Sequence, residues 1–425
     1  MPHASEVFRL IGSAVHAANM LLEWLMTYAI HSTILIGGLL VLTSTVLGRR
    51  LLSGHGSWVW RFALVGAVVT ASLQSIRSAA PLAGTLRLDG DTPASTLVRV
   101  DVRSTGVAVS NPASRNRLMN WNALDGRRTI VTSSVDVRPL WPLLALGAWF
   151  VVAGAMVSWF AILRARFLRS IAPRTSADHT LAGNALRYLR REGHVNRHVR
   201  LTLSDRLTSP VALGFDEICL PARALAELDP IRMESILAHE LAHLVRRDPT
   251  WLTIARVIEA VFFFQPLNRL ARLRMQEAAE FASDAWASTR IARPLDLAHC
   301  LARVAEWTIA APRLLVPAMA EGQGLGRRGA VLVRRVERLT TGRLVHESLP
   351  GKGARLAAAV ALVALVLLAP RAAVGADRPS DRLFDSPVPP DPAGLLMLRR
   401  TVDGVAAGPV RREDQTEMLV LRVRR

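Results

Sequence analysis

The sequence predicts a mainly helical membrane protein, with about four transmembrane helices and one large soluble domain of mixed helix and strand. Three observations support this prediction. Hydrophobic residues make up 51% of the 425 residues, and the mean hydropathy is positive at +0.26. Several apolar stretches approach or exceed the roughly 20 residues that cross a bilayer as a helix. A long polar segment with amphipathic patterning separates the last two of these stretches.

The composition excludes several classes of protein. The net charge is +19, and only Lys352 among the 53 basic residues is a lysine. A disordered basic tail would contain fewer apolar residues, and a disulfide scaffold would need more than two cysteines. We therefore expect Cys219 and Cys300 to be reduced and buried. The length suits two or three structural units.

Four apolar segments are predicted to span the membrane. They cover about residues 20–47, 58–76, 140–163 and 353–374. The alternative for each is a helix buried in a soluble core, which fits the third segment least because it is uncharged. The N-terminus lacks the basic start of a cleaved signal peptide, so we expect the first segment to be retained.

Basic residues near the span ends predict the orientation, because short cytoplasmic loops are enriched in Lys and Arg. The clusters are Arg49, Arg50 and His55; Arg164, Arg166 and Arg169; and Lys352 and Arg355. All three are cytoplasmic if both termini are extracytoplasmic. The prediction is a multi-pass protein of the inner or plasma membrane, with residues 77–139 as an extracytoplasmic loop, residues 164–352 as a cytoplasmic domain and residues 375–425 as a short extracytoplasmic tail.

Two β-like runs open the large domain. They cover residues 199–205 (VRLTLSD) and 212–220 (ALGFDEICL) and are bounded by turn residues. Residues 209–214 could form an edge strand that pairs with an extended substrate, although a purely structural strand is an equal alternative.

Three helices follow the predicted strands. The first should begin with Asp229 as N-cap and Pro230 in the first turn, and should end near Pro249. The second covers about residues 251–266 and is apolar enough to be a core helix or to rest on a membrane surface. The third covers about residues 267–288.

The first of these helices carries the motif HELAH. His239 and His243 are four residues apart, so a helix presents both imidazoles on one face, where they can bind one metal ion. Glu240 is angled away from direct ligation but can serve as general base for a water molecule. This pattern predicts a zincin-like metallopeptidase site with one Zn²⁺. The alternative is a helix with two exposed histidines.

A peptidase zinc site needs a third protein ligand and an open position. Three downstream glutamates compete for this role, namely Glu259, Glu277 and Glu280. We favour Glu280, keep Glu277 as the reserve candidate, and expect Asp284, one turn later, to orient a histidine. The alternative is a solvated acidic helix face.

The central third of the chain resembles the BlaR/MecR-type antirepressor membrane metallopeptidases. The similarity is carried by residues 209–249 (SPVALG through LAHELAHLVRRDP), by FFFQP at 262–266 and by QEAAEFASD at 276–284. RRVERL at 334–339 resembles an arginine-rich stretch of the family. The resemblance implies that His239, His243 and Glu280 are the zinc ligands and that Glu240 is the catalytic base. It also implies the fold given above.

Three departures from the family pattern are visible. Ser283 stands where many relatives have Cys, and Gln265 where many have His or Asn. Neither is expected to bind zinc. Antibiotic-sensing relatives carry a penicillin-binding sensor domain after the fourth span, whereas here a Pro-rich tail without an SxxK motif follows, so a β-lactam receptor role is not expected.

These observations predict an integral-membrane zinc endopeptidase that cleaves a protein substrate, for instance a transcriptional repressor or a regulator in signalling. One alternative is a non-catalytic membrane sensor or scaffold that retains the peptidase fold, but such a protein has no chemical need for Glu240. A second is a membrane-anchored nucleic-acid binder, supported by charge alone. We expect membrane lipids and a protein substrate as partners, and no direct contact with nucleic acid.

Overall fold

A computed structural model of the chain describes residues 2–46, 48, 56–77, 82, 84–87, 96–100, 141–291, 293–310, 325–342, 344, 351–373 and 419–423. Most of the predicted extracytoplasmic loop and tail, together with Arg49, Arg50 and His55, lies outside the described residues. The chain divides into two compact units. The first comprises residues 1–23, 86–147 and 372–425, and the second comprises residues 24–85 and 148–371. In the first unit, strand β2 (Thr96–Val100) pairs antiparallel with β8 (Leu419–Val423).

Three helices among the described residues are long and apolar enough to cross a membrane, namely Leu10–Ser44, Gly56–Ile76 and Trp141–Ser170. The first is built from α1 (Pro2–Ser32), the π-helical turn η1 (Thr33–Gly37) and α2 (Gly38–Ser44); the other two are α4 and α5. Their positions agree with the first three predicted spans, although the first begins at Leu10 rather than near residue 20. The apolar sequence dictates these helices, because only internal hydrogen bonding satisfies the backbone in hydrocarbon.

The fourth predicted span corresponds to a shorter helix, α13 (Lys352–Leu368), of which residues 355–368 are apolar. It packs along α4, and the side chain of Leu362 lies against Gly66. A Cβ atom on Gly66 would lie 2.9 Å from Cδ2 of Leu362, so a larger residue there would require this leucine side chain to shift. Whether α13 crosses the membrane stays a prediction.

The second unit contains a four-stranded sheet in the order β3-β4-β6-β5. Its strands are β3 (Thr175–Ser176), β4 (Arg200–Ser204), β5 (Val211–Leu213) and β6 (Glu217–Pro221). β4 and β6 are parallel, and both outer pairs are antiparallel. The β-like run over residues 212–220 forms two strands, because Gly214, at φ +58°, turns the chain and makes β5 and β6 a hairpin. β5 is an edge strand, as predicted.

Helices pack on this sheet to form the main core. They are α6 (Leu181–Glu192), α7 (Arg223–Glu227), α8 (Pro230–Val245) and α11 (Pro294–Ala310), and α12 (Leu325–Thr341) packs against α11. The core includes Leu189, Leu201, Ile218, Leu237 and Leu241, all completely buried. Burying these side chains removes apolar surface from water, at about 25 cal/mol per Å², and so holds α8 rigidly against the sheet.

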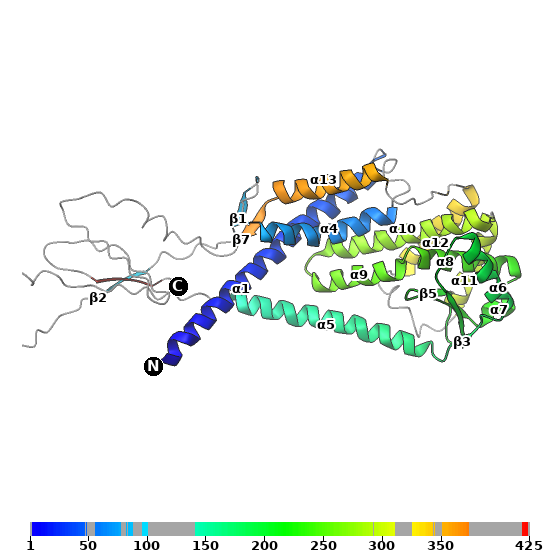
Figure 1. Cartoon of the computed structure of the whole chain (residues 1–425), viewed down its shortest axis with the longest axis horizontal. Helices are drawn as coiled ribbons and strands as arrows, with labels where there is room; N and C mark the ends of the chain where they lie inside the picture. The colour runs from blue at the N-terminus through cyan, green and yellow to red at the C-terminus, as the bar shows by residue number, and fades with distance from the viewer. Residues whose placement is uncertain are drawn as a thin grey trace, which may run out of the picture. The chain divides into compact units, whose positions relative to one another are not determined.

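Helices α9 (Asp248–Val261) and α10 (Pro266–Ile291) form a hairpin that lies alongside α4 (Figure 1). Trp60, Leu64, Ala255, Ala271 and Met275 form a separate buried cluster between these helices. The second predicted helix is therefore a packed helix of the α4 cluster rather than part of the sheet core. The second half of α10 packs against α8, so one helix contacts both the candidate span α4 and a helix of the sheet core.

Gln265, at the tip of this hairpin, ties it to α1 and η1. Its Nε2 atom donates hydrogen bonds to the carbonyl oxygen of Ala29 at 3.0 Å, to Oγ of Ser32 at 2.8 Å and to Oγ1 of Thr33 at 2.9 Å. The residue that departs from the family pattern here thus has a packing role.

Candidate metal centre

Helix α8 begins and presents its histidines as its sequence predicts. The Asp229 side chain caps the helix by accepting a hydrogen bond from the backbone N–H of Arg232 at 2.8 Å, and Pro230 opens the first turn. Apolar residues on the opposite side of α8 enter the core, which fixes the rotation of the helix. His239 is 3% exposed, and the His243 side chain is 13% exposed on the same face.

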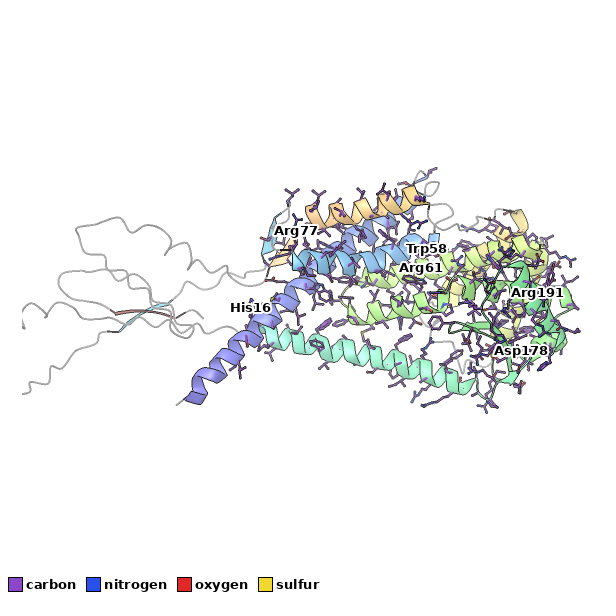
Figure 2. All side chains as sticks on the ribbon, viewed as in Figure 1. His16, Trp58, Arg61, Arg77, Asp178 and Arg191 are labelled. Carbon is purple, nitrogen blue, oxygen red and sulfur yellow. The ribbon has the colours of Figure 1, made fainter. Side chains whose placement is uncertain are left out.

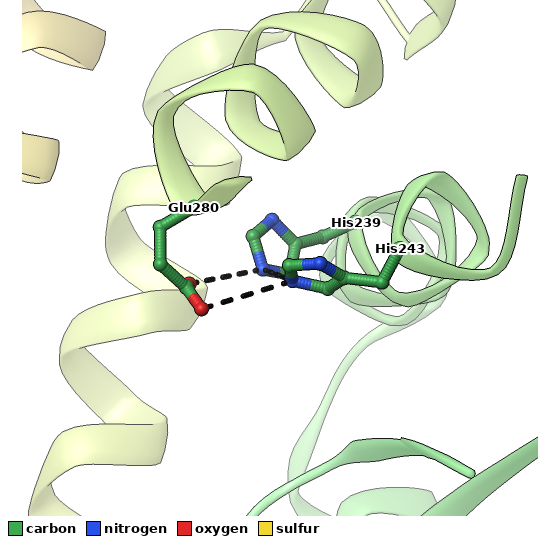
Figure 3. Close-up of side chains that lie close together, drawn as sticks. All are labelled: His239, His243 and Glu280. Atoms are coloured by element: carbon green, nitrogen blue, oxygen red, sulfur yellow. Dashed lines mark hydrogen bonds and ion pairs between the residues drawn. The ribbon is translucent and has the colours of Figure 1, made fainter. Parts of the chain in front are cut away.

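Helix α10 brings Glu280 to these histidines, so that three side chains converge (Figure 3). The Nε2 atoms of His239 and His243 are 3.2 Å apart. Oε2 of Glu280 lies 3.6 Å from Nε2 of His239, and its Oε1 lies 3.9 Å from Nε2 of His243.

These spacings fit one metal ion. Tetrahedral zinc with bonds of about 2.0–2.1 Å holds its ligand atoms about 3.3 Å apart. The Nε2–Nε2 distance of 3.2 Å matches this separation, and the Glu280 oxygens, at 3.6 and 3.9 Å from the two Nε2 atoms, lie slightly further away. Two imidazoles and one carboxylate are also the donor set that suits zinc, with the fourth position left for a reactant. These donors therefore fit a catalytic metal ion.

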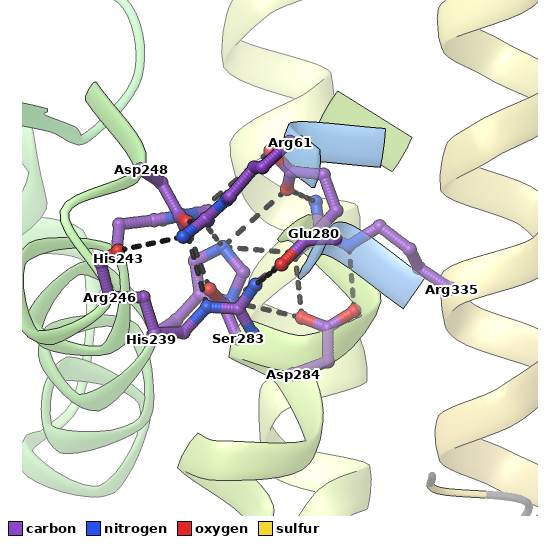
Figure 4. Close-up of polar contacts among 10 residues, drawn as sticks. Arg61, His239, His243, Arg246, Asp248, Glu280, Ser283, Asp284 and Arg335 are labelled. Atoms are coloured by element: carbon purple, nitrogen blue, oxygen red, sulfur yellow. Dashed lines mark hydrogen bonds and ion pairs between the residues drawn. The ribbon is translucent and has the colours of Figure 1, made fainter. Parts of the chain in front are cut away.

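His239 is oriented by Asp284, which Arg335 of α12 holds in turn (Figure 4). Oδ1 of Asp284 lies 3.0 Å from Nδ1 of His239. Arg335 donates to both carboxylate oxygens of Asp284 at 2.7 Å, and its Nη1 lies 2.8 Å from Oε2 of Glu280. A carboxylate on the far ring nitrogen fixes the orientation of a ligating histidine. Asp284 therefore lies beside His239, where it can orient the ring.

His243 has a corresponding partner in Asp248, at the start of α9. Oδ2 of Asp248 lies 2.8 Å from Nδ1 of His243, and Oγ of Ser283 lies 3.2 Å from the same nitrogen. Asp248 is in turn ion-paired with Arg61 of α4. Ser283, expected to affect packing only, thus contacts a predicted ligand.

The buried charges shift the pKa values of the carboxylates at the site. Burial alone would raise the pKa of Glu280, but Arg335 and the two histidines hold that pKa well below its usual range. Asp284 and Asp248 are held low in the same way, against burial, by the arginines and histidines beside them. All three carboxylates are therefore ionised at neutral pH.

His239 shows the opposite shift. Burial and the charge of Arg335 both lower its pKa, but hydrogen bonds to Asp284 and Glu280 outweigh them and raise the pKa to about 9. Without a metal ion, the ring is therefore a positively charged imidazolium at neutral pH, with a proton on each nitrogen. A metal ion must displace the proton on the ligating nitrogen to bind.

The remaining predicted residues divide into two groups. Glu240 is buried, at 7% exposed, on α8 beside the histidines, and its charge acts on Arg335. Glu277 pairs instead with Arg334, at 2.6 Å. Glu259 pairs with Arg272 at 2.5 Å, away from the histidines. The structure thus brings Glu280 to His239 and His243 and gives the other two glutamates different partners.

Three residues at the site were not among the predicted site residues: Asp248, Arg61 and Arg335. Asp248 and Arg335 lie inside motifs that carry the family resemblance, RRDP and RRVERL, which is a usable signal. Arg61 had a weaker signal, since it is a single charge near one end of a predicted span. The cysteines are free and buried, as expected, and lie outside the metal cluster.

Comparison with known proteins identifies the family of this chain. Residues 23–294 match the family described as BlaR1 peptidase M56, which covers well over half of the chain. The chain belongs to this family. The resemblance seen in the sequence is thereby confirmed, and the M56 peptidase is a membrane-associated metallopeptidase. No curated protein matches the chain.

Proposed function

We propose that this M56 peptidase is a zinc endopeptidase, with His239, His243 and Glu280 as metal ligands and Glu240 as general base. The observation that carries the proposal is the convergence of three donor atoms within 4.8 Å, from two helices, beside a buried glutamate. Asp284 and Asp248 complete the set by holding the two imidazoles.

The chemistry divides between the metal and the chain. Bound zinc polarises the scissile carbonyl and makes water more acidic. Glu240 accepts the proton of the attacking water and returns it to the leaving amine, which is the role of a glutamate next to a ligating histidine. Asp284 and Asp248 keep the imidazole rings from rotating, so that both Nε2 atoms stay directed at one point.

The substrate we propose is an extended segment of a protein. Edge strand β5 (Val211–Leu213) packs beside α8, and an extended chain can add to a free sheet edge by backbone hydrogen bonds. By analogy with the antirepressor family, the substrate is a transcriptional repressor or a regulator in signalling. Residues 164–352 would then face the cytoplasm, with both termini outside.

Glu240→Gln tests the catalytic assignment. Cells expressing the wild-type or variant chain are compared for new N-termini among cytosolic and membrane proteins, and zinc in the purified proteins is measured. Glu240→Gln should keep zinc and lose the new N-termini. Glu234→Gln, on the same helix but outside the cluster, should retain both. Cleavage that survives in Glu240→Gln would refute the role of this base.

A further inference from the structure

Arg61 is a buried arginine on α4, the second membrane-spanning helix. The residue is 3% exposed, and it lies with Trp58 at the end of α4 nearer the four-stranded sheet (Figure 2). A charge inside a protein must be paired, because its desolvation is otherwise prohibitive. The structure gives Arg61 a specific set of partners, and these partners lead to the candidate metal centre.

Asp248 is the ionic partner of Arg61. Nη2 of Arg61 donates to Oδ1 of Asp248, whose side chain is 2% exposed. The other carboxylate oxygen, Oδ2, contacts Nδ1 of His243 at 2.8 Å. One carboxylate therefore bridges a membrane-spanning helix and a predicted zinc ligand (Figure 4).

Further contacts hold this bridge in place. Nη1 of Arg61 donates to the backbone oxygen of Arg246 at 3.2 Å, and Arg246 donates from Nη2 to Oγ of Ser57 at 3.0 Å. The guanidinium of Arg61 also lies 5.3 Å from the ring centroids of both Trp58 and Trp251. The charge is thus held by α4, by the end of α8 and by α9 together.

The same arrangement occurs at the other histidine. His239 contacts Asp284, and Asp284 is held by Arg335 of α12. Each of the two histidines therefore has a carboxylate on its Nδ1 atom and a buried arginine behind that carboxylate. Arg335 comes from α12, which packs against helix α11 of the sheet core, whereas Arg61 comes from the membrane-spanning helix α4.

We propose that Arg61 is a positioning residue for the metal centre: through Asp248 it fixes the orientation of His243 and so couples the packing of the second span to metal affinity. This inference rests on the proposed function in one respect, the assignment of His243 as a ligand. Without Arg61, the Asp248 carboxylate keeps Arg246 as a cationic partner, 3.4 Å away on Oδ2, the oxygen that also contacts His243. Arg246 and His243 would then compete for that oxygen, and the His243 ring would be held less firmly in its orientation.

The experiment measures metal binding in the full-length chain in detergent or nanodiscs. Zinc affinity is determined by competition with a chelator, and the visible spectrum of the Co²⁺-substituted protein reports the ligand geometry. Losing a group that orients a ligand typically weakens metal affinity about 10–100-fold. We expect Asp248→Asn to fall in this range, and Arg61→Gln to weaken zinc binding about tenfold and alter the Co²⁺ spectrum.

Two further variants separate positioning from general packing. Arg61→Lys keeps the charge but not the planar guanidinium, and should recover part of the affinity. The double variant Arg61→Gln/Asp248→Asn should bind zinc no more weakly than Asp248→Asn alone, because Arg61 acts through that carboxylate. Arg272→Gln is the matched control: it also removes a buried, ion-paired arginine, next to Glu259 rather than the site, and should leave zinc affinity unchanged.

The outcomes distinguish the two proposals. If His243→Ala abolishes zinc binding while Arg61→Gln keeps wild-type affinity and spectrum, the positioning role is refuted and the zinc site stands. If His243→Ala leaves zinc binding intact, the ligand assignment itself fails. Equal loss in Arg61→Gln and Arg272→Gln, or additive losses in the double variant, would also overturn the inference, because both indicate general destabilisation.

Discussion

Oδ1 of Asp284 lies 3.0 Å from Nδ1 of His239, and both side chains are almost completely buried. An ionised carboxylate can only accept a hydrogen bond, so Nδ1 carries a proton, and Nε2 faces Glu280, His243 and Nη2 of Arg335, which lies 3.2 Å away. This single contact therefore selects which ring nitrogen is offered to a metal ion.

Asp284→Asn is expected to weaken zinc binding about 10–100-fold, because the amide neither holds the His239 ring as strongly nor increases its basicity. Zinc affinity, measured by chelator competition, checks this. Asp296→Asn, a substitution outside the metal cluster, serves as control. Unchanged affinity in Asp284→Asn would show that the contact does not matter for binding.

Glu280→Gln is expected to lower zinc occupancy far more than Glu277→Gln. Only Glu280 lies within ligand distance of both histidines, whereas Glu277 is paired with Arg334. Elemental analysis of the two purified variants provides the measurement. A larger loss in Glu277→Gln would reassign the third ligand.

Zinc affinity is expected to rise with pH up to about pH 9. The pKa of His239 in the metal-free protein is about 9, so below this value a proton competes with the metal. One displaced proton makes the apparent affinity rise about tenfold per pH unit, flattening above the pKa. Titrations between pH 7 and pH 9.5 test this, and a flat profile would contradict it.

The stability of the metal-free protein should show the opposite trend. Because folding raises the pKa of His239 from 6.5 to about 9, this group contributes stability fully below pH 6.5 and loses that contribution as pH rises to about 9. The melting temperature of the zinc-free protein should therefore fall over this range. His239→Gln should lack this part of the pH dependence.

Arg335→Gln is expected to destabilise the metal-free protein by about 3–5 kcal/mol, the cost of leaving a buried carboxylate without its cation. Bound zinc should restore part of this stability, since it places positive charge beside Glu280. Thermal unfolding with and without zinc measures both effects. Arg334→Gln, whose side chain is 43% exposed, should cost less than about 1 kcal/mol. Equal effects in the two variants would refute the special role of Arg335.

Reporter fusions after Arg174 and Ala376 are expected to report opposite sides of the membrane if α13 crosses it. The helix has 17 residues, which at 1.5 Å per residue is about 25 Å, slightly less than the hydrocarbon thickness. The same reporter phenotype at both positions would show that α13 does not cross the membrane.

Much of the fold follows from local pattern. The apolar runs at 58–76 and 140–163 predict α4 and α5 because insertion depends on the summed hydrophobicity of a short segment. The cap at Asp229 and the four-residue spacing of His239 and His243 similarly depend on helix geometry alone. The β-like residues of 212–220 also form strands, but the turn at Gly214 that divides them into β5 and β6 is seen only in the structure.

The sequence by itself determined the apolar helices α4 and α5, the α8 helix and the face on which two histidines meet, since each depends on residues within one or two turns of one another. Only the tertiary structure decided which glutamate joins them. Glu277 and Glu280 lie on neighbouring faces of α10, and the rotation of α10 against α8 and α12 sends one to Arg334 and the other to the histidines. Arg61 and Arg335 reach the site from positions far apart in the chain, because buried carboxylates must find cations wherever packing supplies them.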